Sequence, residues 1–414
     1  MNAASKGGWL VAFRERSFRF QWPADLATTG AFEMETLILG WYVLVETQSV
    51  ILLTLFGSLQ FIGTLIAPFL GVLGDRFGRR TMMLAMRGVF VVLAASIMIL
   101  DLTGLLSPAV VLFIAFLSGL LRPSDLVMRN ALVADTMPPA SLPNALGLAR
   151  TTQDISRIVG ALTGAGLFSV LGLGVAYAFV TATFLIGLAL TAGVSRVRPA
   201  GEEGAPPPAS YGRELKDGFS YVWTTPAVLA IMWLAFLANL TAFPFTHGLL
   251  PFVAREIYAI DENGLGQIIS VFSLGAVTGS LIIAWTRGHG SAARMMVIGL
   301  VAWYLCLTVF AFTGAKLTGA AVLYIIGIFH SLAMVSMSVA LLGMVDAPMR
   351  GRVMGVRILA IYGIPPGLLA AGFLIDTFGF TTMALIYIAV GLVFTALITW
   401  KWRDAIWNDG RPGK

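Results

Sequence analysis

Long apolar stretches alternate with short polar ones along the whole chain. Each stretch is close to the roughly 20 residues that a helix needs to cross a bilayer. The twelve stretches lie near 20–45, 49–74, 81–101, 108–131, 144–170, 174–194, 220–248, 264–286, 294–314, 318–344, 354–375 and 381–401. This pattern predicts an all-α membrane protein with twelve transmembrane helices.

The polar gaps divide the twelve predicted spans into two equal sets. The one long gap, 195–217, is rich in proline, glycine and charge, as expected of a linker. It separates the predicted six-helix halves 1–194 and 218–414. Gly147 and Gly164 recur as Gly355 and Gly372, each 208 positions later. Such a parallel repeat is typical of transporters whose site lies between the halves, near the bilayer midplane.

Composition agrees with this class. The chain is 58% hydrophobic and 12% charged, whereas soluble proteins are nearer half apolar and a quarter charged. Cys306 is the single cysteine, which excludes an intrachain disulfide and a CxxC site. The net charge of +6 lies in loops between spans, so it indicates contact with a lipid bilayer and not with nucleic acid.

Lysine and arginine gather in alternate gaps and at both ends of the chain. Members of this set include Arg76, Arg79, Arg80, Arg196, Arg198, Arg213, Lys216, Arg287, Arg350, Arg352, Lys401 and Arg403. The opposite loops contain only Arg255 and Lys316. Because basic loops stay on the cytoplasmic side, we expect both termini to be cytoplasmic.

One loop carries a recognisable motif. Residues 71–80, GVLGDRFGRR, follow the second predicted span on the inner side. The stretch resembles the signature between spans 2 and 3 of the major facilitator superfamily, on Gly71, Asp75, Arg76, Gly78, Arg79 and Arg80. The resemblance implies two pseudo-symmetric six-helix bundles, alternating access in a bacterial inner membrane and no enzymatic activity. It also implies a latch between Asp75 and the start of span 11, where Arg350 and Arg352 lie.

Two weaker resemblances concern direction of transport. The fifth span matches a glycine-rich exporter pattern at Gly147, Ser156, Gly160, Ala161, Gly164 and Ala165. Small residues at this spacing also serve plain close packing of helices, so both interpretations stay open. Residues 348–354, PMRGRVM, resemble the corresponding stretch of the enterobactin-exporter and macrolide-efflux branch.

Ionisable residues at membrane depth are costly and therefore candidates for function. Span 1 carries Asp25, Glu33 and Glu35 on one polar stripe, with Glu33 about 20 Å from an entry near residue 20. Spans 4 and 5 carry Arg122, Asp125, Arg129, Arg150, Asp154 and Arg157. We expect span 1 to face these two spans, with carboxylates and guanidiniums paired.

This central polar site has two interpretations. One is a structural ion-pair cluster that fixes the bundle. The other is that a carboxylate, Glu33 or Asp125 by depth, takes and releases a proton during transport. We favour Glu33 as the proton carrier, with Arg122 as its modulator, because a rearranging pair can change affinity for the proton.

The second half is nearly free of charge in its spans. Trp233, Phe236 and Phe243 of span 7 and Met334 and Met337 of span 10 are expected to line a cavity for a bulky, partly apolar substrate. The alternative is an ordinary membrane core. His247 and His330 lack partners at ligand spacing, so no metal site is predicted. No nucleotide-binding loop is found, and no cofactor is expected.

Together these features predict a monomeric secondary transporter whose ligands are protons and a small molecule. The favoured function is proton-coupled efflux, as an antiporter, of a small amphipathic compound such as a drug or siderophore. Alternatives are a lysolipid flippase or nutrient importer of the same fold, or a membrane sensor or scaffold that does not transport.

Overall fold

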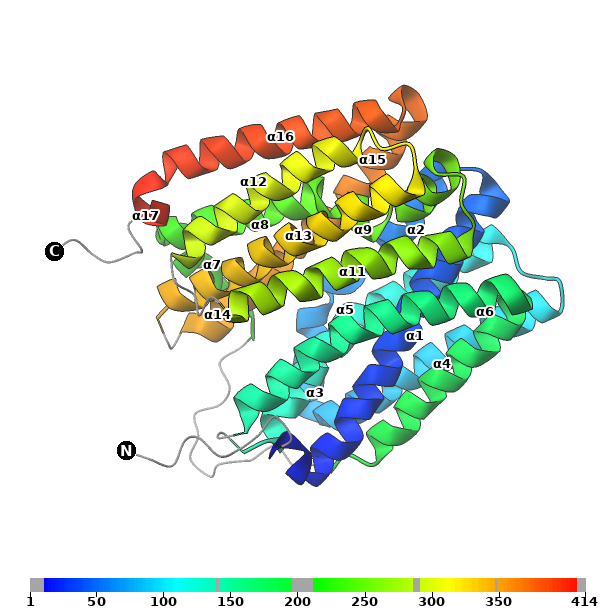
Figure 1. Ribbon diagram of the computed structural model, residues 1–414. Coiled ribbons are helices and arrows are strands. Elements are labelled where there is room, and N and C mark those ends of the chain that lie inside the picture. The colour runs from blue at the N-terminus through cyan, green and yellow to red at the C-terminus, as the bar shows by residue number, and fades with distance from the viewer. Residues whose placement is uncertain (1–10, 139–140, 196–210, 286–290, 347–348, 408–414) are drawn as a thin grey trace. The chain divides into compact units, whose positions relative to one another are not determined.

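The computed structural model describes residues 11–138, 141–195, 211–285, 291–346 and 349–407, and every regular element within these ranges is a helix (Figure 1). The first group of helices comprises η1 (Val11–Arg14), α1 (Arg16–Thr47), α2 (Val50–Leu59), η2 (Ile62–Leu65), α3 (Ala67–Phe77), α4 (Arg79–Leu102), α5 (Pro108–Thr136) and α6 (Leu142–Ala192). The second comprises α7 (Tyr211–Thr224), α8 (Pro226–Thr241), α9 (Phe243–His247), α10 (Leu250–Phe252), the π-helix η3 (Val253–Ile257), α11 (Glu262–Trp285), α12 (Ala292–Phe310), α13 (Lys316–Met344), α14 (Arg350–Ala360), η5 (Ile361–Gly363), α15 (Ile364–Phe378), α16 (Phe380–Lys401) and α17 (Arg403–Trp407).

All twelve predicted stretches coincide with helical segments. Among the described residues, eight helices are long and apolar enough to cross a membrane, or nine if the bent pair α7 and α8 forms one span. The long helix α6 accounts for two predicted stretches. Helix α1 is not counted among the eight because its carboxylates and threonines lower its hydropathy. The stretch 49–74 is divided among the shorter helices α2, η2 and α3.

Glycines at positive φ mark two of the predicted boundaries. Gly78, with φ 89° and ψ 127°, separates α3 from α4 inside the signature motif. A side chain would be strained in this conformation, whereas glycine adopts it freely. Gly172, with φ 77° and ψ 175°, breaks α6 between the fifth and sixth predicted spans.

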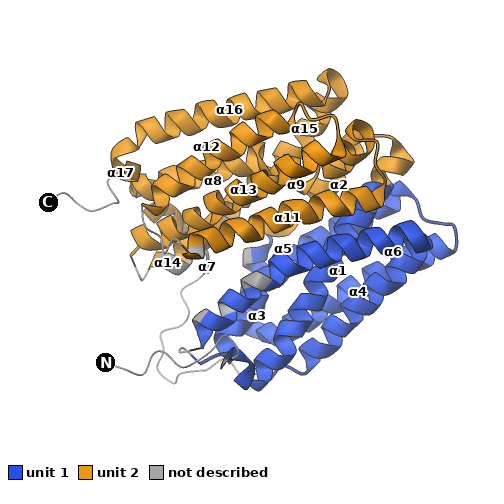
Figure 2. Cartoon of the chain, in the orientation of Figure 1, with its two compact units in different colours: residues 1–42, 66–205 blue, residues 43–65, 206–414 orange. Residues whose placement is uncertain are grey.

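The chain forms two compact units (Figure 2). The first comprises residues 1–42 and 66–205, and the second comprises residues 43–65 and 206–414. The boundary at 205 lies inside the predicted linker 195–217. Residues 43–65 belong to the second unit, whereas the sequence repeat assigns them to the first six-helix half. The division into two six-helix halves stays a prediction.

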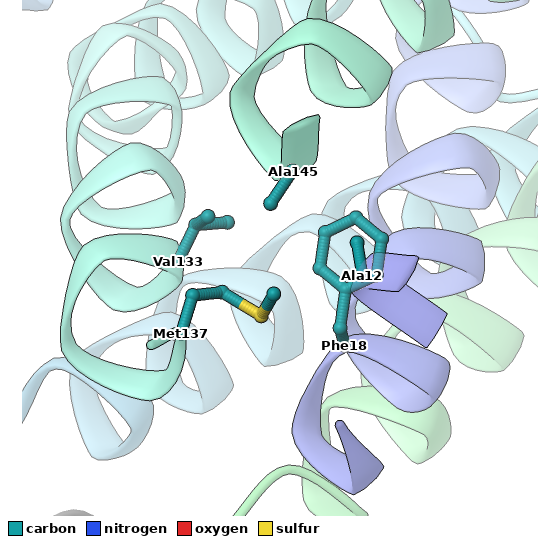
Figure 3. Packing of buried hydrophobic residues seen from close by; sticks show 5 residues of the cluster. All are labelled: Ala12, Phe18, Val133, Met137 and Ala145. Carbon is teal, nitrogen blue, oxygen red and sulfur yellow. The ribbon is translucent and has the colours of Figure 1, made fainter. Parts of the chain in front are cut away.

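Within the first unit, α4 packs along α6 and α5. An apolar cluster packs the start of α1 against α5 and α6 (Figure 3). Its residues come from three parts of the sequence. Ala12 and Phe18 meet Val133 and Met137 at the end of α5, and Ala145 near the start of α6. The guanidinium of Arg19 donates to the carbonyl oxygens of Phe13 and Arg14, at 2.8 and 2.9 Å, so the turn η1 folds back onto α1.

Within the second unit, α11 and α12 both pack along α13, and α2 packs along α15. Small residues allow the latter contact: a Cβ added at Gly372 would overlap the side chain of Thr54. The Ser58 hydroxyl donates to the carbonyl oxygen of Pro365 at 3.1 Å. Arg255 donates to the carbonyl oxygen of Leu44 at 2.8 Å, which explains why this early segment belongs to the later unit.

The glycines of α6 bring this helix against α1 in the first unit. A Cβ added at Gly160 would lie 2.9 Å from the carbonyl oxygen of Gly30 and 2.8 Å from the Cβ of Glu33. A Cβ added at Gly164 would lie 3.0 Å from the Cα of Met34. These two positions of the exporter-like pattern therefore serve close packing beside the polar stripe of α1.

We expect Gly160→Ala to lower the free energy of unfolding by about 1–3 kcal/mol, because the new methyl group would meet backbone that cannot move aside. Gly166→Ala, in the same helix, is the matched control, since nothing lies within 4 Å of its added Cβ. Thermal unfolding of the purified protein in detergent compares the two. A Gly160→Ala protein as stable as the control would contradict the close approach of α1 and α6.

Candidate functional site

The polar site of the first unit contains two groups of residues, each gathered around an arginine. We call Asp25, Arg87, Asp125 and Arg129 the Arg87 cluster. We call Phe32, Glu33, Glu35, Thr36, Ser118 and Arg122 the Arg122 cluster. Both clusters use α1 and α5, as expected, and Asp25 and Glu33 lie about 12 Å apart along α1 at 1.5 Å per residue.

The Arg87 cluster is almost completely shielded. The exposed fraction is 0% for Arg87, 4% for Asp25, 2% for Asp125 and 5% for Arg129. Nη2 of Arg87 lies 2.5 Å from Oδ1 of Asp25, and its Nε lies 3.3 Å from Oδ1 of Asp125. Nε of Arg129 lies 4.0 Å from Oδ2 of Asp25. Two arginines thus face two aspartates.

Each guanidinium also donates to a hydroxyl group, and the backbone of Arg129 accepts a further hydrogen bond. Nη1 of Arg87 donates to the hydroxyl of Thr191 in α6 at 2.5 Å. Nη1 of Arg129 donates to the hydroxyl of Thr29 at 2.7 Å. The backbone carbonyl oxygen of Arg129 accepts from the side chain of Gln21 at 2.9 Å. The cluster therefore ties together α1, α4, α5 and α6.

The contacts of the Arg122 cluster include an aromatic ring. The guanidinium carbon of Arg122 lies 4.6 Å from the ring centroid of Phe32, within the range of a cation–π contact. Its Nη1 donates to the hydroxyl of Thr36 at 2.9 Å. Glu33 and Glu35 attract Arg122 electrostatically, and Arg157 repels it.

The two glutamates of this cluster differ in exposure. Glu35 is buried, and one of its carboxylate oxygens accepts from the Ser118 hydroxyl at 3.4 Å. Glu33 is half-buried, next to the close approach of α6. Asp154 and Arg157 are also half-buried, on α6. The structure therefore brings the predicted site residues into one bundle but divides them between two environments.

Arg87 is the residue that analysis of the sequence overlooked. It is a lone basic residue in the apolar stretch 81–101, and a single arginine at that depth is itself a signal of a paired site. Its partners lie on α1, α5 and α6, so no spacing within its own stretch identifies them.

The gating motif is described only in part. Nη1 of Arg79 lies 2.6 Å from Oδ1 of Asp135, and Arg80 donates to the carbonyl oxygen of Ala192 at 2.5 Å. Arg76 is exposed. The side chains of Asp75 and Arg350 lie outside the described residues, so the latch stays a prediction. In the second unit, Arg352 pairs with Asp217 of α7 at 3.3 Å.

The predicted lining residues of the second half differ in exposure. Met337 is buried, Phe236, Phe243 and Met334 are half-buried, and Trp233 is exposed. The ring of Phe243 lies 5.5 Å from Trp303 and 5.2 Å from His330 between centroids. The rings of His247 and His330 lie 6.3 Å apart. Their lining of a cavity stays a prediction.

The fold and these buried charges define a multi-pass α-helical membrane protein with an ionic site inside its first bundle. The family model of the major facilitator superfamily matches residues 26–365. The chain belongs to this superfamily of transporters.

Relatives and solved structures support the assignment of the fold. Macrolide efflux protein A of Streptococcus pyogenes is 22% identical over 262 residues, which span 62% of this chain and 62% of that protein. A bacterial homologue of the lysosomal transporter Spinster, in an inward-facing and unoccupied conformation, matches 96% of this chain and 98% of its own with a TM-score of 0.74 and 14% identity. The nucleoside transporter NupG matches 93% of this chain and 99% of its own, with a TM-score of 0.72 and 14% identity.

A double-mutant cycle tests the contact between Phe32 and Arg122. We expect a coupling of about 1–2 kcal/mol between Phe32→Leu and Arg122→Met, because the ring face stabilises a desolvated cation. Phe90→Leu combined with Arg122→Met is the control cycle: Phe90 packs edge-on against Phe32, at 4.8 Å between centroids. Chemical unfolding in detergent measures both cycles. Equal coupling in the two cycles would contradict a direct contact.

Proposed function

We propose that this transporter exports a small amphipathic compound, a drug or a siderophore, in exchange for protons by alternating access. The Arg122 cluster is the observation that carries the proposal. Two carboxylates of α1 lie near one arginine of α5 inside an apolar bundle. In such surroundings an unpaired charge is strongly destabilising.

In this proposal Glu33 carries the proton and Arg122 responds to it. When Glu33 is ionised, it attracts Arg122 and leaves little free charge for a ligand. When Glu33 takes a proton, the guanidinium loses the attraction of that carboxylate, which favours its movement toward another acceptor. Glu33 suits this role better than Glu35 because it is half-buried, so a proton can reach it more readily.

Export and the class of substrate have a separate basis. The relative from Streptococcus pyogenes is an efflux protein for macrolides, which are bulky and partly apolar compounds. The exporter-like glycines of α6 and the stretch 348–354 support the same direction. The aromatic and methionine side chains of α8, α9 and α13 would accommodate such a compound, because these side chains adapt to varied shapes.

Transport in inside-out vesicles tests direction and substrate class. We expect macrolides, lipophilic drugs or siderophores from a panel to accumulate inside the vesicles when their interior is made acidic, and to stop accumulating when a protonophore collapses the gradient. Vesicles without the protein provide the baseline. Loss of preloaded compound driven by the same gradient would show import and overturn the proposed direction.

Glu33→Gln tests the proton carrier. We expect proton-driven accumulation to fall at least tenfold, because the amide cannot take up a proton, while exchange of labelled for unlabelled substrate without a gradient continues. Glu46→Gln is the matched control, since Glu46 is an exposed carboxylate near the end of the same helix. Undiminished coupling in Glu33→Gln would overturn this assignment. Coupling lost only in Glu35→Gln would transfer the role to Glu35.

A further inference from the structure

Arg87 occupies a position where an unpaired charge would be strongly destabilising. It lies within the membrane-crossing helix α4, and its side chain is fully shielded from solvent. Moving a cation out of water costs several kcal/mol unless opposite charge and hydrogen bonds compensate for it. The surroundings of Arg87 must therefore supply that compensation permanently.

The guanidinium uses one nitrogen for each neighbouring helix. Nη2 contacts Asp25 of α1, Nε contacts Asp125 of α5, and Nη1 contacts Thr191 of α6. A planar guanidinium has five N–H donors in fixed directions, so it bonds several partners only where those partners stay in place. This geometry is that of a fixed clamp joining three helices to a fourth.

The charges of the Arg87 cluster also balance. Asp25 and Asp125 offset Arg87 and Arg129, and the third contact of Arg87, the hydroxyl of Thr191, is uncharged. If either aspartate took a proton, one buried arginine would lose its counter-charge. Proton uptake by this cluster is therefore resisted as long as Arg87 stays in place.

We propose that Arg87 is a positioning residue that keeps Asp25 and Asp125 permanently ionised, so that among the carboxylates of the two clusters only Glu33 and Glu35 exchange protons. The restriction of proton exchange to the two glutamates rests on the proton coupling proposed above. The permanent ionisation of the two aspartates does not. The proposal removes Asp125, which the sequence offers as a proton carrier beside Glu33, and with it Asp25 of the same polar site.

Infrared titration of the full-length protein in lipid nanodiscs tests this without any substrate. Protonated carboxylic acids give a carbonyl-stretch band that carboxylates lack. We expect Asp25→Asn and Asp125→Asn each to leave the pH-dependent bands of the wild type unchanged. We expect the combined Glu33→Gln and Glu35→Gln variant to lose pH-dependent bands that both aspartate variants keep.

Removal of the clamp should create a new proton site. In Arg87→Met we expect one additional protonated carboxyl band near neutral pH, because one negative charge is left without a partner. Asp125 is the expected site, since Asp25 still faces Arg129. The band should vanish in Arg87→Met with Asp125→Asn, which restores the balance of charge, and should be missing from Arg87→Lys, which keeps the cation.

Thr191→Val is the matched control for the loss of a bond without a change of charge. It removes the acceptor of Nη1, and we expect no new band. Where a compound is transported, the pH midpoint of transport should shift in Arg87→Met and return to the wild-type value in the charge-balanced double variant. A merely structural role would lower activity in both without moving that midpoint.

Three results would overturn the proposal. The first is loss of a wild-type band in Asp25→Asn or Asp125→Asn, and the second is no new band in Arg87→Met. The third is a new band in Arg87→Met that persists when either Asp125→Asn or Asp25→Asn is added to that variant. If Arg87→Met does not fold, the two single aspartate variants still decide the question. A failure of proton coupling has a different signature, because vesicle transport would then ignore the gradient while the infrared result for Arg87 still holds.

Discussion

The balance of buried charge around Arg87 is the constraint on which the first unit depends. A guanidinium that is fully shielded needs its counter-charges at fixed distances, and here they come from α1 and α5, with a hydroxyl from α6. Since apolar contacts alone do not drive helices together in a bilayer, polar contacts and close packing must do so. The Arg87 cluster supplies the first, and the glycines of α6 supply the second where they meet α1.

This constraint explains why α1 tolerates so many polar residues. Its stripe carries Asp25, Thr29 and Thr36, each of which bonds an arginine of α4 or α5. The stripe lowers the hydropathy of α1 below that of the other long helices. The same residues that make the helix look poorly suited to a membrane are those that hold it in the bundle.

Much of the fold could be predicted from the sequence, because period, length and turn residues are local properties. The twelve stretches, the turn at Gly78 and the break at Gly172 all follow from such signals. The neighbours of Arg87 do not, because a helical period identifies the face of a residue but not the helix opposite that face. The membership of residues 43–65 in the second unit depends likewise on contacts with α15 and Arg255, more than 200 positions away.

The two clusters differ in a way that bears on what each can do. Arg87 is held by two carboxylates and a hydroxyl, so any movement breaks several strong bonds at once. The surroundings of Arg122 include an aromatic face and a hydroxyl as well as the carboxylates of Glu33 and Glu35. An aromatic face attracts a cation over a broad range of positions, so this contact of Arg122 survives small shifts of the guanidinium. A transporter needs both kinds of contact: one that preserves the bundle while it moves, and one whose partners exchange during the cycle. The pairs that Arg87 forms with Asp25 and Asp125 are therefore poorly suited to carry a proton, which agrees with our proposal that Glu33, the half-buried carboxylate that attracts Arg122, carries it.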